Sequence, residues 1–368
     1  MAQSLSDQLK NFLTFLEMKE CRRKNIPPSS ILFPVIWITN RCNLRCKMCD
    51  QWKTPEPLIA QELSTKEWYS FIDSVARMHA LVINITGGEP FLRPDIFDII
   101  RYIRSKNISC HICSNGTQFN RTVIDRLKSS PPDTISISLD SYCAEIHNEL
   151  RGVDCFDRIV EGVRLLRSNL PTVKVGINYV ITRQNFYNLS RMISFAERLG
   201  VDQLKFDPIH VNLMHRKKPL PSFKDLLFHE EDLPELHSEI KKLMNALGNT
   251  KLLTNSYSFV RGITSLYNGR FDKLPCHAGY ISCAIDALGW VSPCDNFEGK
   301  ENLKEKPLEE IWKSSIFQRQ RQAVHRCSAH CWDSTHAELN IRCSLRGLLE
   351  FPQILREFYY YLGSPKDS

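Results

Sequence analysis

The chain has 368 residues, of which 42% are hydrophobic and 24% charged. This composition is typical of a soluble globular protein and excludes a disordered one. No uncharged apolar stretch approaches the roughly 18 residues of a membrane span, and the start of the chain lacks the basic-then-apolar order of a signal peptide. We therefore expect a cytoplasmic protein with no membrane partner, built from one large domain and a smaller one.

The net charge is +7, from 48 Lys and Arg against 41 Asp and Glu. Basic residues gather in two places, at 19–24 and around Arg319, Arg321 and Arg326. Proteins that bind nucleic acids usually show a stronger and more concentrated basic stripe, so nucleic acid is not an expected partner. Most such runs are solvated faces; an anionic substrate, tRNA or an acidic partner protein are the functional alternatives.

Between residues 31 and 207, short apolar and β-branched runs alternate with segments of helical periodicity. The runs predict strands at 31–39, 81–86, 109–113, 134–139, 173–181 and 203–206. Most of them are apolar on both faces, as expected of parallel strands covered by helices. The first predicted helix has Ser64 and Glu67 as a capping box, and the others lie at 95–103, 122–127, 157–166 and 189–199. This alternation predicts an α/β fold with a parallel sheet, open or curled into part of a barrel.

After Asp207 a proline-rich linker precedes a predicted helix at 236–247. From Cys276 onward the sequence is rich in turns and cysteines, with a hairpin predicted between 281–285 and 290–293 and a last amphipathic helix at 352–362. The predicted division is a helical extension (1–30), a main α/β domain (31–230), a helical linker (231–275), a small Cys-rich domain (276–345) and a C-terminal helix (346–368).

Fourteen cysteines in a chain without an export signal indicate metal binding and not a disulfide framework. Cys42, Cys46 and Cys49 form a C-x3-C-x2-C motif directly after the first predicted strand, a spacing that can hold three corners of a cubane iron–sulfur cluster. Such clusters usually take four Cys ligands, and no fourth cysteine lies nearby, which leaves one iron open for a substrate or cofactor. The alternative is a zinc site completed by a histidine such as His79.

This motif resembles the signature of the radical SAM superfamily, and further motifs follow in the family's order. The resemblance implies a partial (β/α)6 TIM-type barrel, in which the open iron of a 4Fe–4S cluster chelates S-adenosylmethionine (SAM). It also implies that side chains after later strands bind this cofactor, namely Gly87, Gly88 and Glu89 of a GGE motif, Ser138, Arg151 and Asn178. Met48 stands where the family usually has an aromatic residue near the adenine.

The resemblance assigns a role to each of these residues. Glu89 would meet the methionine amino group, and the glycines before it allow close backbone approach. Ser138 is similar to the polar position that meets the ribose or the methionine carboxylate, and Asn178 would lie near the ribose. Arg151 resembles the arginine that pairs with the methionine carboxylate, a task that suits a planar guanidinium group.

A second group of cysteines resembles the SPASM/twitch extension of radical SAM enzymes, which holds auxiliary 4Fe–4S clusters. Six cysteines follow from Cys276 where the full SPASM pattern has seven, so we expect the smaller twitch form with one auxiliary cluster. Its expected ligands are Cys276, Cys294, Cys327 and Cys331. Cys283 and Cys343 would be core thiols or replacement ligands. The alternative is a mixed Cys/His zinc site that draws on His277, His325, His330 or His336.

Asp295 directly follows one of these cysteines. In SPASM enzymes that oxidise a serine or cysteine side chain, an aspartate at this place resembles the base that takes the substrate proton. An aspartate that caps the backbone of a turn is the alternative.

The resemblance implies an oxidoreductase-type radical SAM enzyme that takes an electron from a flavodoxin- or ferredoxin-type donor and abstracts hydrogen from its substrate. We expect a small-molecule substrate, oxidised for example by dehydrogenation. A peptide maturase is the alternative; such enzymes often carry a leader-binding domain, and only 30 residues precede the first predicted strand. A zinc protein that binds nucleic acid is the remaining alternative, and it requires the order of all these motifs to be accidental.

Overall fold

In the computed structural model, nine strands form one sheet in the order β6-β5-β4-β3-β2-β1-β7-β8-β9. The structure describes residues 5–187, 189–209, 223–268, 274–329, 331–344, 347, 349–350 and 360–361. Six strands run parallel, namely β1 (Val35–Trp37), β2 (Val82–Thr86), β3 (Ser109–Ser114), β4 (Thr134–Ser138), β5 (Lys174–Ile181) and β6 (Gln203–Pro208). The other three are β7 (Ala284–Ile285), β8 (Trp290–Ser292) and β9 (Glu301–Asn302). β7 pairs in parallel with β1 and begins an antiparallel meander, so the predicted hairpin is confirmed as an extension of the main sheet.

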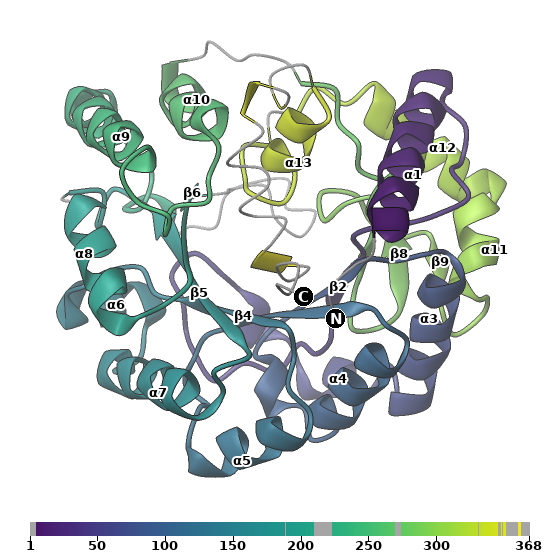
Figure 1. Ribbon diagram of the computed structural model, residues 1–368, viewed down its shortest axis with the longest axis horizontal. Helices are drawn as coiled ribbons and strands as arrows, with labels where there is room; N and C mark the ends of the chain where they lie inside the picture. Colours follow the sequence, from purple (N-terminus) through teal and green to yellow (C-terminus); the bar gives the residue numbers. More distant parts are fainter. Residues whose placement is uncertain are drawn as a thin grey trace.

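Helices pack along the outer side of this sheet and around the opening of the arc. They are α1 (Leu5–Lys24), α2 (Glu56–Ile59), α3 (Thr65–Arg77), α4 (Ile96–Ser105), α5 (Arg121–Ser129), α6 (Ala144–Arg151), α7 (Phe156–Asn169), α8 (Leu189–Leu199), α9 (Leu233–Leu247), α10 (Tyr257–Asn268), α11 (Leu308–Lys313), α12 (Ser315–His325) and α13 (Ala337–Arg342). In Figure 1, α3 to α8 follow the outside of an arc of strands, and α13 lies in the opening of the arc between α10 and α1. The predicted partial barrel is confirmed, and it is open.

Local sequence explains most element boundaries. Ser64 and Glu67 form the predicted capping box at the start of α3. β1 is shorter than its predicted range of 31–39 because Pro34 has no backbone N–H and interrupts the ladder. The backbone before it still pairs, since Leu32 N and Phe33 N both donate to Ile281 O.

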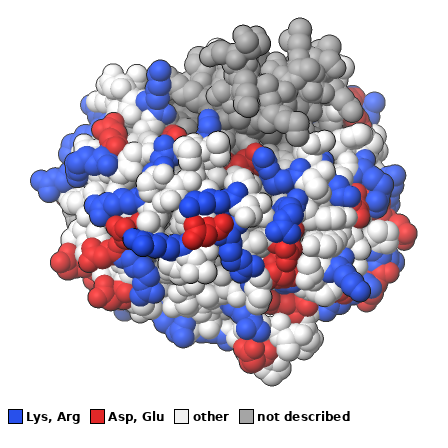
Figure 2. Space-filling model, turned by 60° about the horizontal axis from the view of Figure 1, so that its bottom comes forward, with Lys and Arg blue, Asp and Glu red and all other residues white. Residues whose placement is uncertain are grey.

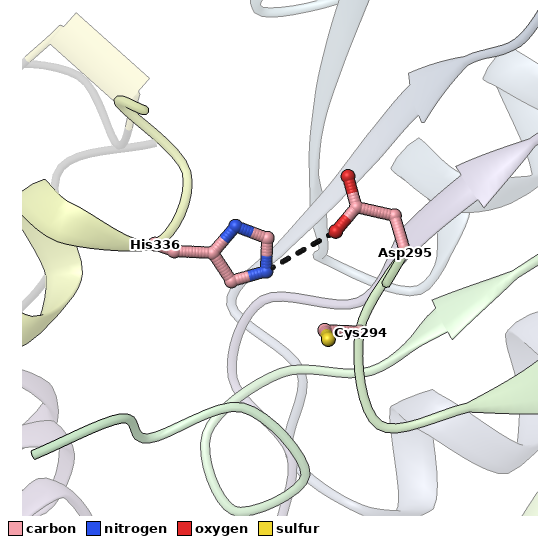
Figure 3. A group of neighbouring side chains, drawn as sticks. All are labelled: Cys294, Asp295 and His336. Atoms are coloured by element: carbon pink, nitrogen blue, oxygen red, sulfur yellow. Dashed lines mark ion pairs between the residues drawn. The ribbon is translucent and has the colours of Figure 1, made fainter. Parts of the chain in front are cut away.

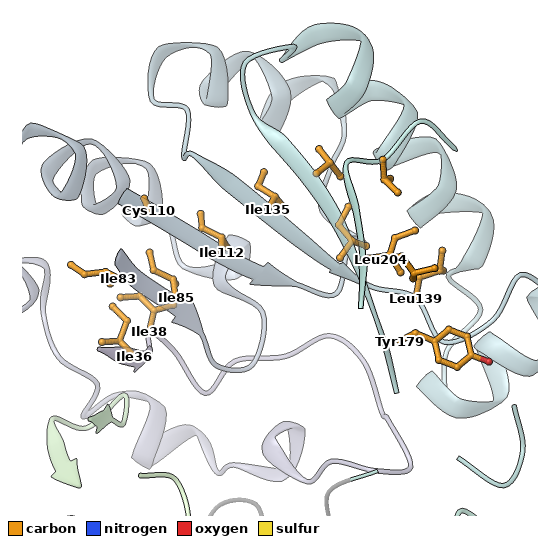
Figure 4. Close-up of a cluster of buried hydrophobic side chains, with 14 of the residues drawn as sticks. Ile36, Ile38, Ile83, Ile85, Cys110, Ile112, Ile135, Leu139, Tyr179 and Leu204 are labelled. Atoms are coloured by element: carbon orange, nitrogen blue, oxygen red, sulfur yellow. The ribbon is translucent and has the colours of Figure 1, made fainter. Parts of the chain in front are cut away.

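The two faces of the parallel sheet differ in polarity, which corrects the expectation that both are apolar. One row across the strands is Ile36, Ile85, Ile112, Ile135 and Val175, and Figure 4 shows side chains of this core. The neighbouring rows on the other face carry Asn84, His111, Thr134 and, nearer the carboxyl ends, Ser138, Asn178 and Lys205. This face lines the inside of the arc, where the ring of Tyr361, one of the two described helical residues near the C-terminus, contacts His111.

The helices α2, α6, α10, α12 and α13 were not predicted. α6 has eight residues and no side-chain cap, so its sequence signal is weak. The predicted C-terminal helix at 352–362 lies outside the described residues, except for Tyr360 and Tyr361. The division into five segments stays a prediction. Among the helices that the structure describes, none is both long and apolar enough to cross a membrane.

Candidate functional site

The first cysteine group lies in the loop after the carboxyl end of β1. Two backbone hydrogen bonds fix this loop to the end of α6, from Arg45 N to Arg151 O (3.0 Å) and from Lys47 N to Leu150 O (2.9 Å). Gly152 ends α6 with a φ of +68°, and a Cβ atom at this position would lie 2.4 Å from Arg45 O. A helix that was not predicted thus positions the predicted cysteine loop.

The thiols of this loop suit a cationic metal centre. Burial raises the pKa of Cys42 to about 11, and the neighbouring Cys46, Glu89 and Cys49 contribute to the rise. A buried thiol of this kind loses its proton only when a cation stabilises the thiolate, and the irons of a 4Fe–4S cluster provide that charge. His79 cannot complete a zinc site here, because it is exposed between α3 and β2, at the amino ends of the parallel strands. The cysteine loop lies at their carboxyl ends.

Arg151 lies between the cysteine loop and a buried carboxylate. Its Nη1 atom is 3.8 Å from Cys46 Sγ, and its Nη2 atom is 2.6 Å from Asp140 Oδ2. Burial alone would lower the pKa of Arg151, but Asp140 and Cys46 raise it above its usual value. Its Nε–H has no hydrogen-bond acceptor among the described residues. A buried donor without a partner beside the cysteines fits the expected contact with an anionic group of SAM.

The GGE segment packs directly on the backbone that leads into the cysteine loop. Gly88 N donates to Thr39 O (2.8 Å) and Glu89 N to Arg41 O (2.7 Å). A Cβ atom on Gly88 would lie 2.1 Å from Arg41 O, and one on Gly87, where φ is +134°, would lie 2.4 Å from Thr39 O. Both positions therefore require glycine, as expected of a close backbone approach.

The carboxylate of Glu89 is fully buried and bound by the protein itself. It accepts hydrogen bonds from Ser114 Oγ (2.9 Å), Asn115 N (2.7 Å) and Phe91 N (3.1 Å). Burial raises its pKa to about 7, against the lowering effect of these hydrogen bonds. Its contact with the methionine amino group stays a prediction.

We expect a Gly88→Ala variant to lose the iron bound by the first cysteine loop. The added Cβ atom meets backbone and not a flexible side chain, so the loop must move away from the GGE segment. Gly200→Ala is the control for the added methyl group, because no atom lies within 4 Å of its Cβ; unlike Gly88, Gly200 has a positive φ (+68°), which strains an alanine there. The control is expected to lose about 1 kcal/mol of stability and no iron. Equal iron content in Gly88→Ala and wild type, after anaerobic reconstitution, would contradict the packing argument.

The other predicted SAM-binding residues lie on or near the inner face. Ser138 and Asn178 are paired neighbours on β4 and β5, and Asn178 is paired in turn with Lys205 on β6. Asn178 Nδ2 lies 4.0 Å from Cys113 Sγ. Met48 is half-buried and packs against a small apolar cluster around Leu150. Ser138 and Asn178 thus share one row, while Met48 belongs to the cysteine loop.

The second predicted site is a small cavity in the Cys-rich region. The cavity has a volume of about 60 Å³, and its lining includes all four predicted ligands, Cys276, Cys294, Cys327 and Cys331. Burial raises the pKa of Cys331 to about 12, and Asn296 Nδ2 donates to its sulfur (3.1 Å). Four thiols around one cavity fit the ligand set of a 4Fe–4S cluster.

The two remaining C-terminal cysteines lie elsewhere. Cys283 is fully buried in the main core, and Cys343 packs with Met18, Leu32 and Ile281 in a separate apolar cluster. Neither lines the cavity, which favours their role as core thiols.

The four histidines of the zinc alternative are not equivalent. His336 lines the cavity, while His277 is engaged with Asn340 (Nδ1 to Oδ1, 3.2 Å) and His325 is exposed. His330 lies outside the described residues. Only one of the three described histidines is therefore placed to contact a metal in the cavity.

Asp295 belongs to a buried group of charges beside this cavity, which Figure 3 shows. His336 Nε2 lies 3.4 Å from Asp295 Oδ1, and His336 Nδ1 lies 3.0 Å from Asp333 Oδ1. Burial would lower the pKa of His336, but the two carboxylates raise it well above its usual value. Cys294, Asp295 and His336 each have a donor atom within 4.8 Å of the others. The sequence indicated Asp295 as a site residue but not this network. The spacing of Asp333 and His336, three residues apart, was the only sign of it in the sequence.

The Cys-rich region spans the opening of the arc and is bonded to both sides. Ser334 donates to Asp207 on β6, from its N to Oδ1 (2.6 Å) and from its Oγ to Oδ2 (3.0 Å). Burial and the nearby Asp333 raise the pKa of Asp207 to about 6. On the other side, Arg22 Nε of α1 donates to Cys276 O (2.6 Å). The second cysteine site therefore lies across the opening from the inner face of the sheet.

Comparisons with known proteins agree with both sites. Residues 36–195 match the radical SAM superfamily, and residues 276–333 match SPASM, an iron–sulfur cluster-binding domain. The chain is 24% identical to the AdoMet-dependent heme synthase of Methanosarcina barkeri over 345 residues, which cover 90% of this chain and 96% of that protein. It is 27% identical to the mycofactocin maturase MftC of Mycobacterium tuberculosis over 293 residues, 77% of this chain and 71% of MftC.

A solved structure shows the same fold. SuiB of Streptococcus suis, bound to its precursor peptide SuiA, superimposes with a TM-score of 0.63 at 19% identity, over 86% of this chain and 72% of SuiB. With the three-cysteine loop beside Arg151 and the four-cysteine cavity, these matches identify the cofactors as 4Fe–4S clusters and SAM. The chain therefore belongs to the radical SAM superfamily and carries a C-terminal SPASM domain.

Proposed function

We propose that this protein is a radical SAM oxidoreductase that abstracts a hydrogen atom from a substrate held inside the arc. The observation that carries the proposal is the presence of two separate cysteine sites around one polar inner face: the three thiols after β1 and the four-thiol cavity across the opening. When bound, the first cluster supplies the electron that cleaves SAM to methionine and a 5′-deoxyadenosyl radical, and the second supplies an electron acceptor, which makes the net reaction an oxidation.

The residues of the chain orient the cofactor. Cys42, Cys46 and Cys49 hold the first cluster, and a flavodoxin- or ferredoxin-type protein donates the electron. Arg151 directs its guanidinium group to the methionine carboxylate, since its Nε–H has no protein acceptor among the described residues. The remaining contacts with SAM come from Gly87, Gly88, Glu89, Ser138, Asn178 and Met48. Cys276, Cys294, Cys327 and Cys331 hold the auxiliary cluster.

For the substrate, we propose a small molecule. The heme synthase of Methanosarcina barkeri aligns with this chain over nearly its whole length, and its name gives heme, a small molecule, as its product. The inner face of the arc offers the half-buried side chains of Ser138 and Asn178 to such a compound, whereas His111 and Lys205 are buried against Tyr361. A peptide is the second candidate, supported by the similarity to MftC and by the fold shared with SuiB, which was solved with a precursor peptide.

One experiment tests both the radical SAM reaction and the class of substrate. The anaerobically reconstituted chain is incubated with SAM and dithionite, and 5′-deoxyadenosine is measured by chromatography. Extract from the producing cells, before and after protease treatment, is then added. Formation of 5′-deoxyadenosine supports the radical SAM reaction, and its absence would contradict it. Stimulation that survives protease favours the small molecule, whereas stimulation that protease removes favours the peptide.

Asp295 is proposed as the base that takes the substrate proton as the substrate is oxidised. An Asp295→Asn variant is expected to lose product formation at least about 100-fold, the usual contribution of a general base, while SAM cleavage continues. Asp125→Asn, at an exposed position on α5, serves as the matched control. Full substrate turnover by Asp295→Asn would leave the residue as a structural partner of His336.

A further inference from the structure

α12 presents a stripe of side chains to solvent. Arg319, Gln322, Ala323 and Arg326 follow one another at helical spacing, and all four are exposed. The opposite side of the helix buries Phe317, Arg321 and Val324. We call the four exposed residues the α12 stripe; its two charged members are Arg319 and Arg326.

Arg321, which belongs to the same basic run in the sequence, has a structural role instead. It is fully buried and donates to Gly279 O (2.6 Å) and Trp312 O (2.7 Å). Its guanidinium group also stacks on the rings of Trp312 and Phe317. The structure thus separates the buried cation from the two exposed ones.

The α12 stripe leads to the second cysteine site. Arg326 is followed directly by Cys327, which lines the cavity and is half-buried, and the next residues, Ser328 and Ala329, are exposed. Ala329 N donates to Cys327 Sγ (3.4 Å). This loop therefore separates the cavity from solvent. A molecule bound on the outer side of the loop would lie close to the ligands of the auxiliary cluster.

The stripe carries two cations without a carboxylate partner among the residues that the structure describes, although Glu298 is bonded to the same helix (Gln320 Nε2 to Glu298 O, 2.8 Å) and pairs with Lys300. The sequence has no Asp or Glu between Glu310 and Asp333, and neither Arg319 nor Arg326 forms a salt bridge with any described residue. Arg319 and Lys300 also border a shallow groove of about 480 Å³, whose lining includes Ile316. Two exposed cations with no carboxylate partner beside an apolar side chain are typical of a surface that binds an acidic protein.

The basic run near the N-terminus differs from this stripe. In the run at 19–24, Arg23 and Lys24 both pair with Glu20, and Arg22 donates to Cys276 O. On the face shown in Figure 2, Lys and Arg are interspersed with Asp and Glu. The unpaired cations of the α12 stripe lead directly into the exposed loop after Cys327, so a molecule that binds these cations also lies close to the cavity.

We propose that the α12 stripe docks an acidic one-electron carrier protein of the flavodoxin or ferredoxin class, which exchanges electrons with the auxiliary cluster site. This rests on the proposed function, in which oxidation of the substrate leaves one electron at that site. The carrier in its oxidised form accepts this electron and is reduced by one, so that the site returns to its oxidised state. Charge complementarity brings the carrier to the Cys327 loop.

The test measures binding and not turnover. The dissociation constant of oxidised flavodoxin for the reconstituted full chain is determined by calorimetry at low salt, for wild type, Arg319→Glu/Arg326→Glu and Arg319→Lys/Arg326→Lys. The charge reversal is expected to weaken binding at least about tenfold, and the lysine variant to retain it, because the surface acts through charge. Lys241→Glu, at an exposed position on α9, is the control and should bind as wild type does.

Two further measurements keep the outcomes distinct. The iron content and the dithionite-driven cleavage of SAM should be equal in all four proteins, which shows that the charge reversal leaves the fold and both clusters intact. Wild-type affinity in Arg319→Glu/Arg326→Glu, or no binding of flavodoxin to wild type, overturns the docking proposal and leaves the radical SAM function untouched. Absence of SAM cleavage in wild type contradicts the function instead, whatever the binding result.

Discussion

Replacement of Cys42, Cys46 and Cys49 together by alanine is expected to remove about four of about eight iron atoms per chain, and with them all cleavage of SAM. The expected remainder of about four irons belongs to the four-thiol cavity, which shares no side chain with the first loop. Iron and labile sulfide are measured after anaerobic reconstitution, together with 5′-deoxyadenosine formation. The loss of SAM cleavage should be complete, because these three thiols are the proposed ligands of the cluster that cleaves SAM.

Cys143→Ala is the matched control for this prediction. Cys143 precedes α6, is half-buried and lies in neither site, so its removal should leave about eight irons and normal SAM cleavage. About four irons in wild type and none in the triple variant would show that the cavity holds no cluster. The proposed oxidation would then lack its electron acceptor, and a redox-neutral reaction would take its place.

Arg151→Met is expected to have two effects, because Arg151 serves both the fold and the cofactor. Its removal leaves the fully buried Asp140 carboxylate without its cation, which is expected to cost about 3–5 kcal/mol in the free energy of unfolding. It also removes a charge-assisted contact with SAM, worth about 1.5–3 kcal/mol, so SAM affinity should fall at least about tenfold. Chemical denaturation and equilibrium dialysis with SAM measure the two effects.

The variant Asp140→Asn/Arg151→Met separates these effects. Removing both partners of the ion pair should restore much of the stability, since the amide oxygen introduced by Asp140→Asn can still accept the hydrogen bond from Val180 N that Asp140 Oδ1 accepts now (3.0 Å). SAM binding should stay as weak as in Arg151→Met. If the double variant binds and cleaves SAM as wild type does, the assignment of Arg151 to the methionine carboxylate is wrong.

The sequence predicted what depends on local pattern. The strands of the parallel sheet, the capping box at Ser64 and the hairpin around Gly289 follow from hydrophobic periodicity and turn chemistry. The two cysteine groups were found for a similar reason, because each consists of a few thiols at short spacing. Their grouping in space agrees with the structure, in which four of the six C-terminal cysteines line one cavity.

What the sequence did not predict depends on tertiary placement. The polar row of Ser138, Asn178 and Lys205 arises from the register of three strands, and a single strand shows it as one polar residue. The contact between His336 and Asp295 joins two segments that no periodicity relates. α6 was missed because eight residues give little signal, although its end holds the loop of the first cluster.

The pairing of β7 with β1 has a consequence for how the protein is assembled. Ala284 and Ile285 complete the open side of β1, a strand that is synthesised at the start of the barrel. Until the SPASM hairpin has been synthesised, β1 is an edge strand whose backbone groups on one side have no partner. The cysteine loop that follows β1 is then attached to an incomplete sheet. Contacts this distant in sequence form slowly. We therefore expect iron–sulfur loading of the first site to follow release of the whole chain, and a chain cut before Cys276 to aggregate through its exposed β1 edge.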